Sequence, residues 1–461
     1  MNLMRMWLTG CALASIVGAP QPSIAQDSPL ARAIHDTVFG NGLEVLVVEN
    51  HLVPVTTVLV AVKNGAFTQQ PGEQGLAHLY EHLLFRTYDR DPFAFNQEVA
   101  KLSGAYNGST HEEVVTYYVT VPSEKTDDAI ELLGRLLTRA RFRENDLVEE
   151  RRVVLDELFR ARSDPEQTLE RQVGEQLWGE SWHLRDIAGD SASLNAITLD
   201  QLEANFERYY IPNNSALIVT GDISPAEVFR DVERRFGDWE RGIDPLPTRT
   251  TQAFVPLGGS RAVVVGEGNI QDVTVSIALH GPSLQEDTSS TYAADALLAV
   301  LNESSSKFQK HLVGSGLFQW VDVEYRTLRE PSAITFRAKT TVELAEHAVV
   351  ALVSALDQAQ FLLDLTPEDL AIAQRARELD MALTVEASAG LAPSLAIWWA
   401  SAGIDYYLSY DVRLNVQTLS DLRHFADAYV LGRPKVIGVL APPSARNRIA
   451  SWLQGASGSR P

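Results

Sequence analysis

Two histidines and a glutamate lie within five residues of one another in the stretch GLAHLYEHLLF, residues 75–85. The apolar spacing of this stretch predicts a helix over residues 74–87. Side chains four positions apart project from one face of a helix about 6 Å apart, so His78 and His82 can bind one metal ion. Glu81 lies beside the same point. The alternative is a pair of ordinary histidines on a half-buried helix.

The spacing of these three residues matches the inverted zinc-peptidase motif H-x-x-E-H. Imidazole nitrogens suit zinc, and a catalytic zinc site takes three protein ligands and leaves one position for water. The motif therefore provides two ligands and a base, and it requires a third ligand from elsewhere in the chain.

The stretch EERRVVLDELFR, residues 149–160, is the best candidate for that ligand. Glu150 and Glu157 are seven positions apart and share one helical face, with Val153 and Val154 between them to anchor that side in a core. A surface helix with salt bridges is the alternative, because the same stretch contains three arginines, Arg151, Arg152 and Arg160. The spacing alone leaves both interpretations open.

Other histidines and acidic residues compete for a role at a metal. His111, Glu112 and Glu113 precede a predicted strand, where a solvated turn is the alternative. His183 and His280 are isolated, and lone histidines are more often structural than metal-binding.

Length and composition indicate a folded protein with more than one domain. The chain has 461 residues, 45% of them hydrophobic and 21% charged, so it can bury sizeable cores. Its formal net charge of −21 argues against a nucleic-acid partner, which would need a basic surface, and against docking on anionic lipid.

The first 25 residues are typical of a secretory signal. Arg5 precedes an apolar run, and Ser23, Ile24 and Ala25 form a small-x-small cleavage site. We therefore expect an exported, periplasmic protein, and no later apolar stretch is long enough to predict a transmembrane segment. Cys11, the only cysteine, follows Leu8-Thr9-Gly10, so a lipid-anchored protein is the alternative.

The periodicity predicts an α+β fold of two similar domains in tandem, each of about 200 residues and each a β-sheet covered by helices. Residues 34–240 form the first domain and residues 257–455 the second, joined by a proline-containing linker at 241–256. At the start of the first domain, NGLEVLVVEN and TTVLVAVK are expected to be adjacent strands. The late strand KVIGVLAPPSA repeats the pattern of SALIVTGDI at the end of the first domain.

Several motifs in order make a family resemblance specific. GLAHLYEHLLFRT, GAYNGSTHEEVVTYYVTVP, EERRVVLDEL and YYIPNNSALIVTGDI resemble the pitrilysin family of zinc peptidases, in the branch of the mitochondrial processing peptidase subunits. The resemblance covers residues 34–240 clearly and the remainder faintly. It implies a fold in which two similar α+β domains form half of a clam-shell chamber.

The resemblance also implies a role for individual residues. His78, His82 and Glu157 match the three ligands of one Zn²⁺ ion per chain, Glu81 matches the general base that acts on the zinc-activated water, and Glu150 matches a second glutamate that supports the site. Asn107 matches the asparagine that holds the substrate backbone, and the edge strand after it would hold an extended peptide. Together these residues imply a zinc metalloendopeptidase.

One departure from the family pattern concerns the second domain. Active members carry an arginine and, seven residues later, a tyrosine, where this chain has Leu312 and Gln319. Tyr325, Arg326 and Arg329 lie downstream, but their spacing differs. We therefore expect a homologous subunit without the zinc motif to supply the pair in a heterodimer, with a homodimer as the alternative. A noncatalytic structural or peptide-binding subunit is the alternative function.

Overall fold

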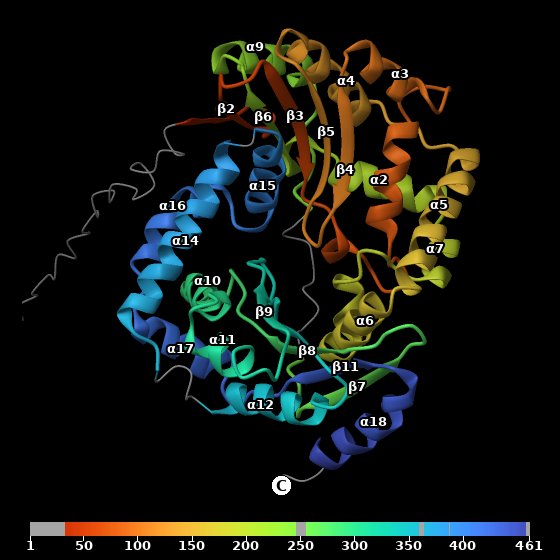
Figure 1. Cartoon of the computed structure of the whole chain (residues 1–461). Helices are drawn as coiled ribbons and strands as arrows, with labels where there is room; N and C mark the ends of the chain where they lie inside the picture. The colour runs from red at the N-terminus through yellow and green to blue at the C-terminus, as the bar shows by residue number, and fades with distance from the viewer. Residues whose placement is uncertain (1–32, 246–254, 359–363, 387, 458–461) are drawn as a thin grey trace, which may run out of the picture.

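The computed structural model describes residues 33–245, 255–358, 364–386 and 388–457 (Figure 1). These residues form two β-sheets covered by helices. The predicted export signal at residues 1–25, including Cys11, lies outside the described residues, as do residues 246–254 of the predicted linker. Within the described ranges, no helix is both long enough and apolar enough to cross a membrane.

The first half contains a six-stranded sheet in the order β1-β2-β6-β3-β5-β4. Its strands are β1 (Ile34–Val38), β2 (Glu44–Glu49), β3 (Val55–Val62), β4 (Ala105–Thr110), β5 (Val115–Pro122) and β6 (Ser215–Gly221). Its helices are α2 (Leu76–Arg86), α3 (Ala94–Lys101), α4 (Thr126–Thr138), α5 (Glu144–Arg162), α6 (Pro165–Trp178), α7 (Ser191–Ala196), α8 (Leu199–Tyr209) and α9 (Pro225–Phe236).

The second half contains a five-stranded sheet in the order β7-β11-β8-β10-β9. Its strands are β7 (Arg261–Gly266), β8 (Val273–His280), β9 (Trp320–Tyr325), β10 (Ala333–Thr340) and β11 (Val436–Ala441). Its helices are α10 (Thr288–Asn302), α11 (Lys307–Leu312), α12 (Ala345–Asp357), α14 (Pro367–Glu386), α15 (Ser388–Ser401), α16 (Ile404–Asn415), α17 (Leu419–Tyr429) and α18 (Pro443–Ser457).

The two halves share one topology. In each sheet the last strand of the half pairs in parallel with the first long strand and antiparallel with the next: β6 with β2 and β3, and β11 with β7 and β8. The helix before that last strand begins with a capping box in both halves, at Thr198 in α8 and at Thr418 in α17. The prediction of two similar α+β domains in tandem is therefore confirmed.

Each half also places one helix on the sheet of the other half (Figure 1). Helix α6 packs on β7, β8 and β11, where Val173 shares a buried cluster with Leu440. Helix α15 packs on β3 and β6, where Trp399 shares a buried cluster with Ile218. Because buried apolar side chains fill both contacts, the two halves hold one another through reciprocal hydrophobic packing.

The expectation that the first two strands are adjacent was wrong for β2 and β3. Strand β6 lies between them, and all its residues are buried because both its neighbours and both its faces are covered. Leu217 faces the core that contains α2 and α4, whereas Ile218 faces α15. A turn between two β-rich runs predicts a hairpin, but it cannot reveal a strand that enters the sheet about 150 residues later.

Candidate metal centre

Helix α2 presents its two histidines on one side. The predicted helix over residues 74–87 is confirmed as Leu76–Arg86, with Leu79, Tyr80, Leu83 and Leu84 buried against the core. The rings of His78 and His82 have centroids 4.8 Å apart and stand nearly perpendicular, at 88°. Because the apolar face fixes the rotation of the helix, the two rings project together toward α5 and β4.

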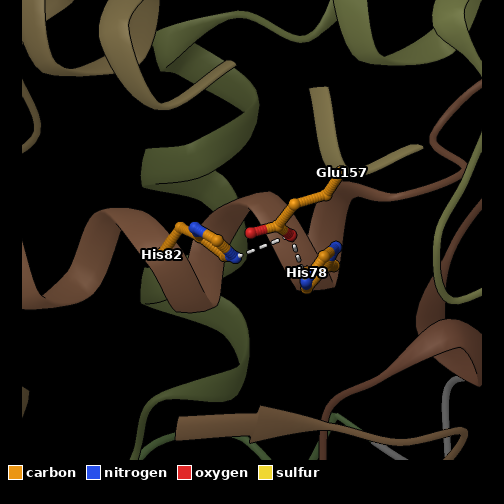
Figure 2. A group of neighbouring side chains, drawn as sticks. All are labelled: His78, His82 and Glu157. Atoms are coloured by element: carbon orange, nitrogen blue, oxygen red, sulfur yellow. Dashed lines mark ion pairs between the residues drawn. The ribbon is translucent and has the colours of Figure 1, made fainter. Parts of the chain in front are cut away.

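Helix α5 brings Glu157 between the two rings (Figure 2). Glu157 Oε2 lies 3.8 Å from Nε2 of His78 and 3.5 Å from Nε2 of His82. Within the part of the chain that the structure describes, these three residues form the one group whose ligand atoms lie close enough to share a metal ion, all within 4.8 Å of one another.

This donor set fits a zinc ion. Two imidazole nitrogens and one carboxylate oxygen are one of the ligand sets found in catalytic zinc sites, and ligands about 2.0–2.1 Å from a tetrahedral ion lie roughly 3.3 Å apart. The distances from Glu157 to the two rings are only slightly longer. The side chain of Glu157 is 40% exposed, so the three donors face an open space where a fourth ligand can enter.

Helix α5 buries only one of the two valines that were expected to anchor it. Val154 is buried as predicted, but Val153 is 39% exposed. At 100° per residue, the helix buries the stripe of Leu147, Val154 and Leu158, and Val153 lies outside that stripe. Glu157 therefore stands at the margin of the buried face, which explains how it reaches the histidines while it remains accessible.

Glu150 supports His82 from the side opposite Glu157. Its Oε2 lies 3.3 Å from Nδ1 of His82, and its Oε1 forms an ion pair with Nε of Arg86. An Nδ1–H donated to this carboxylate leaves the Nε2 lone pair of His82 free to bind a metal. Although burial alone would raise the pKa of Glu150, the bond to His82 and the charge of Arg86 lower it, so the carboxylate stays ionised.

The two histidines differ in their electrostatic environment. Burial, with a smaller contribution from the charge of His82, lowers the pKa of His78 to about 4, so its imidazole is neutral and can donate a lone pair at neutral pH. Burial would also lower the pKa of His82, but its bond to Glu150 and the charges of Glu81 and Glu157 raise it.

Glu81 lies against the edge strand β4. Only 9% of the residue is exposed, and Thr110 Oγ1 donates a hydrogen bond of 3.1 Å to its Oε2. A β-carbon on Gly108 would collide with its Oε1, so the glycine allows this close approach. Burial raises the pKa of Glu81, with partial opposition from His82 and Thr110, and a raised carboxylate pKa favours proton acceptance near neutral pH.

Asn107 lies within β4, at the edge of the sheet, rather than just before the edge strand as the sequence suggested. It is exposed, and its side-chain oxygen accepts a hydrogen bond from the backbone N–H of Gly108. Asn107 lines a cavity of about 600 Å³ together with His78, Glu81 and Glu157. The free edge of β4 therefore runs along the same cavity as the candidate metal ligands.

The competing candidates have other partners. Glu112 forms an ion pair of 2.8 Å with Arg326, and Glu113 accepts a hydrogen bond from the backbone N–H of Arg329. His111 contacts Ser109 through Nε2. The two isolated histidines, His183 and His280, contact the backbone carbonyls of Glu180 and Leu177.

The two positions that depart from the family pattern lie in the second half. Leu312 is fully buried in the core of that half, and Gln319 is exposed beside β10. Arg326, one of the downstream alternatives, is bound to Glu112, and the hydroxyl of Tyr325 donates to the carbonyl of Pro282. Among the described residues, the cavity that contains the histidines and Glu157 is lined neither by Leu312 and Gln319 nor by Tyr325 and Arg326.

Three residues around the site were not predicted from the sequence: Arg86, Gly108 and Thr110. Arg86 follows His82 by four positions and so shares its helical face, a signal that could have been used. Gly108 and Thr110 lie in β4, a strand whose bounds were not predicted. Their roles depend on how β4 packs against α2.

Comparison with known protein families gives two adjoining matches. "Insulinase (Peptidase family M16)" matches residues 44–190, and "Peptidase M16 inactive domain" matches residues 196–377. The first match contains all the candidate site residues, and the second begins near α8 and extends into α14.

Individual relatives agree with these matches. The chain is 25% identical over 407 residues to "Zinc protease PqqE" of Helicobacter pylori, covering 86% of this chain and 90% of that protein. It is 24% identical over 311 residues to "Probable mitochondrial-processing peptidase subunit beta, mitochondrial" of Arabidopsis thaliana, covering 66% and 58%. For two rickettsial zinc proteases at 25% identity, the chain spans about half the length of the relative.

A solved structure of a protease from Helicobacter pylori has the same fold. Its TM-score with this chain is 0.78 at 22% sequence identity, and the match covers 89% of this chain and 99% of the other. The arrangement of two tandem domains in one half of a clam-shell is therefore shared along nearly the whole chain.

Proposed function

Because this chain belongs to the M16 family of peptidases, we propose that it is the zinc-binding subunit of an exported metalloendopeptidase. One observation carries the proposal: His78 and His82 from α2 meet Glu157 from α5 around one point, with the carboxylate of Glu81 on the same helix beside them. The similarity to a zinc protease supports zinc-dependent hydrolysis of peptides. The positions of these side chains support their roles as ligands and base.

The residues of this chain would hold one zinc ion through Nε2 of both histidines and the carboxylate of Glu157. When bound there, zinc would polarise the scissile carbonyl and lower the pKa of a water molecule. Glu81 takes a proton from the attacking water as the water oxygen bonds to the carbonyl carbon. It then passes the proton to the amide nitrogen as the carbon–nitrogen bond breaks.

The edge strand β4 would bind the peptide in an extended form. In the described part of the chain, no strand pairs with its outer side, so its backbone groups can pair with an extended peptide substrate. Asn107 would hold the substrate backbone where β4 passes the cavity. Because backbone pairing does not read side chains, we expect a broad sequence preference.

A partner subunit would complete the site. Leucine cannot donate a hydrogen bond to a developing oxyanion, and Leu312 is buried in the core of the second half. Position 312 therefore cannot supply the hydrogen bond that an arginine gives in the family pattern. A homologous subunit without the zinc motif would supply an arginine and a tyrosine. The predicted export signal supports a periplasmic location for this heterodimer.

Replacement of Glu81 by Gln tests the proposal. The variant should retain one zinc ion per chain and lose at least 100-fold in peptide cleavage, because the amide cannot accept the proton. Glu124→Gln, an exposed position in the same half, serves as the matched control. Unchanged cleavage by Glu81→Gln would remove Glu81 from its role, and failure of the wild-type chain to bind zinc would favour a noncatalytic subunit.

A further inference from the structure

Arg86 reaches the candidate metal centre through one intermediate carboxylate. It lies one turn after His82 on α2, and its Nε forms an ion pair with Oε1 of Glu150. The other oxygen of Glu150 lies 3.3 Å from Nδ1 of His82. Arg86, Glu150 and His82 therefore form a continuous chain of contacts that ends on the ring whose Nε2 faces Glu157.

Because the Glu150 carboxylate is buried, its orientation depends on its protein partners. The Glu150 side chain is only 9% exposed, so water provides little to hold it. With His82 as its one partner, the carboxylate could rotate about its terminal bond. Arg86 opposes that rotation, because its charged Nε–H holds Oε1 of Glu150 while Oε2 faces Nδ1 of His82.

Both the backbone carbonyl and the guanidinium of Arg86 have partners. Its backbone carbonyl accepts a hydrogen bond of 3.0 Å from Nη2 of Arg143, and its Nη1 contacts Oε2 of Glu149 at 2.9 Å. The Glu149 side chain is 60% exposed, so that outer contact is weak. The contact with Glu150 is the more buried one, because that side chain is only 9% exposed.

From this geometry we infer that Arg86 is a positioning residue for the metal centre. It holds Glu150 against Nδ1 of His82, which keeps the Nε2 lone pair of His82 directed at the zinc position. The inference rests on the proposed zinc site. It concerns His82 alone, because Nδ1 of His78 is buried and has no hydrogen-bond partner among the residues that the structure describes.

Zinc affinity, measured by competition with a chromophoric chelator, tests the inference without any assay of cleavage. Arg86→Gln should bind zinc about 10- to 100-fold more weakly than the wild type, since partners that orient metal ligands have effects of that size. Arg86→Lys should recover part of the loss, because it keeps the positive charge but lacks the Nε–H that contacts Glu150. Glu149→Gln, which removes only the exposed contact, should bind zinc as the wild type does.

The sign of the effect separates this role from simple electrostatics. Removal of a positive charge near a cation site would by itself strengthen zinc binding. Equal or tighter binding by Arg86→Gln would therefore overturn the inference. If Arg86→Gln does not fold, as judged by circular dichroism of the metal-free protein, Arg86→Lys is compared with Glu149→Gln in the same way.

A double-mutant cycle tests whether Arg86 acts through Glu150. In a Glu150→Ala background, Arg86→Gln should cause no further loss of zinc affinity, because there is no carboxylate left to orient. Additive losses would show that Arg86 does not act through Glu150. Failure of the wild-type chain to bind zinc would instead count against the proposed function, so the two failures are distinguishable.

Discussion

The carboxylate of Glu81 lies directly against the backbone of Gly108, in the edge strand that lines the candidate metal cavity. A β-carbon at position 108 would collide with Glu81 Oε1. Glu81, the proposed general base, is thus in contact with β4, the strand proposed to bind the substrate. A side chain at position 108 must displace one of the two.

Replacement of Gly108 by Ala should therefore lower kcat at least 10-fold while zinc content stays near that of the wild type, because the base moves but the three ligands do not. Steady-state kinetics and metal analysis of the same preparation check this outcome. Gly40→Ala is the control, since a β-carbon there meets no other atom within 4 Å. A normal kcat for Gly108→Ala would mean that the position of Glu81 against β4 is irrelevant to catalysis.

The pH dependence of cleavage should respond to Thr110. The hydrogen bond from Thr110 favours ionised Glu81 and so lowers its pKa. Thr110→Val removes the donor, which raises the pKa of Glu81, so the acid limb of the kcat profile should move to higher pH. Thr110→Ser keeps the hydroxyl and should leave the limb in place. An unmoved limb in Thr110→Val would assign the acid limb to another group.

The sequence predicted the two histidines and Glu81, but it did not predict the residues that contact them. Helical periodicity placed His78, Glu81 and His82 on one side of a helix because that relation is local. It left Glu157 open between ligand and surface residue, because the spacing within α5 says nothing about where α5 packs against α2. The family resemblance, rather than spacing, favoured the ligand.

The same limit applies to the fold. Two tandem α+β domains follow from the repeated order of strands and helices, which is a local pattern. The insertion of β6 between β2 and β3, and the packing of α6 and α15 on opposite sheets, are long-range contacts that no local pattern contains. Val153 shows the limit within one helix, since its exposure depends on which stripe of α5 meets the core.

Stability should depend on Glu113, which links the turn after β4 to the second half through the backbone N–H of Arg329. Burial raises the pKa of Glu113 to about 7, against partial opposition from Ser401 and Arg329. A carboxyl whose folded pKa exceeds its unfolded pKa stabilises the protein fully below the unfolded value of about 4.5. That contribution is lost as the pH rises through about 7.

Glu113→Gln removes this titration. Compared with the variant, the wild type should lose on the order of 3 kcal/mol of unfolding free energy between pH 4.5 and 7, as 1.36 kcal/mol per pKa unit implies. Denaturant unfolding of both proteins at pH 5 and pH 8 measures the difference. If the unfolding free energies of the two proteins changed equally between pH 5 and pH 8, the raised pKa of Glu113 would be contradicted.

Cleavage should also depend on a second subunit. Because Leu312 and Gln319 replace the arginine and tyrosine of the family pattern, the isolated chain should cleave peptides slowly. A mixture with a homologous subunit that lacks the zinc motif should cleave them at least 10-fold faster. The comparison is a peptide assay at equal zinc content. Full activity of the isolated chain would refute the shared site.

Zinc stoichiometry of the purified chain, measured side by side for the wild type and Glu157→Ala, tests whether the three proposed ligands bind one metal ion. Asp156→Asn, at an exposed position next to the ligand on α5, controls for changes to the helix. We expect one zinc ion per chain in the wild type and in Asp156→Asn, and loss of zinc in Glu157→Ala after dialysis against a chelator. Retention of stoichiometric zinc by Glu157→Ala, or its absence from the wild type, would contradict the convergence of His78, His82 and Glu157 on one metal ion.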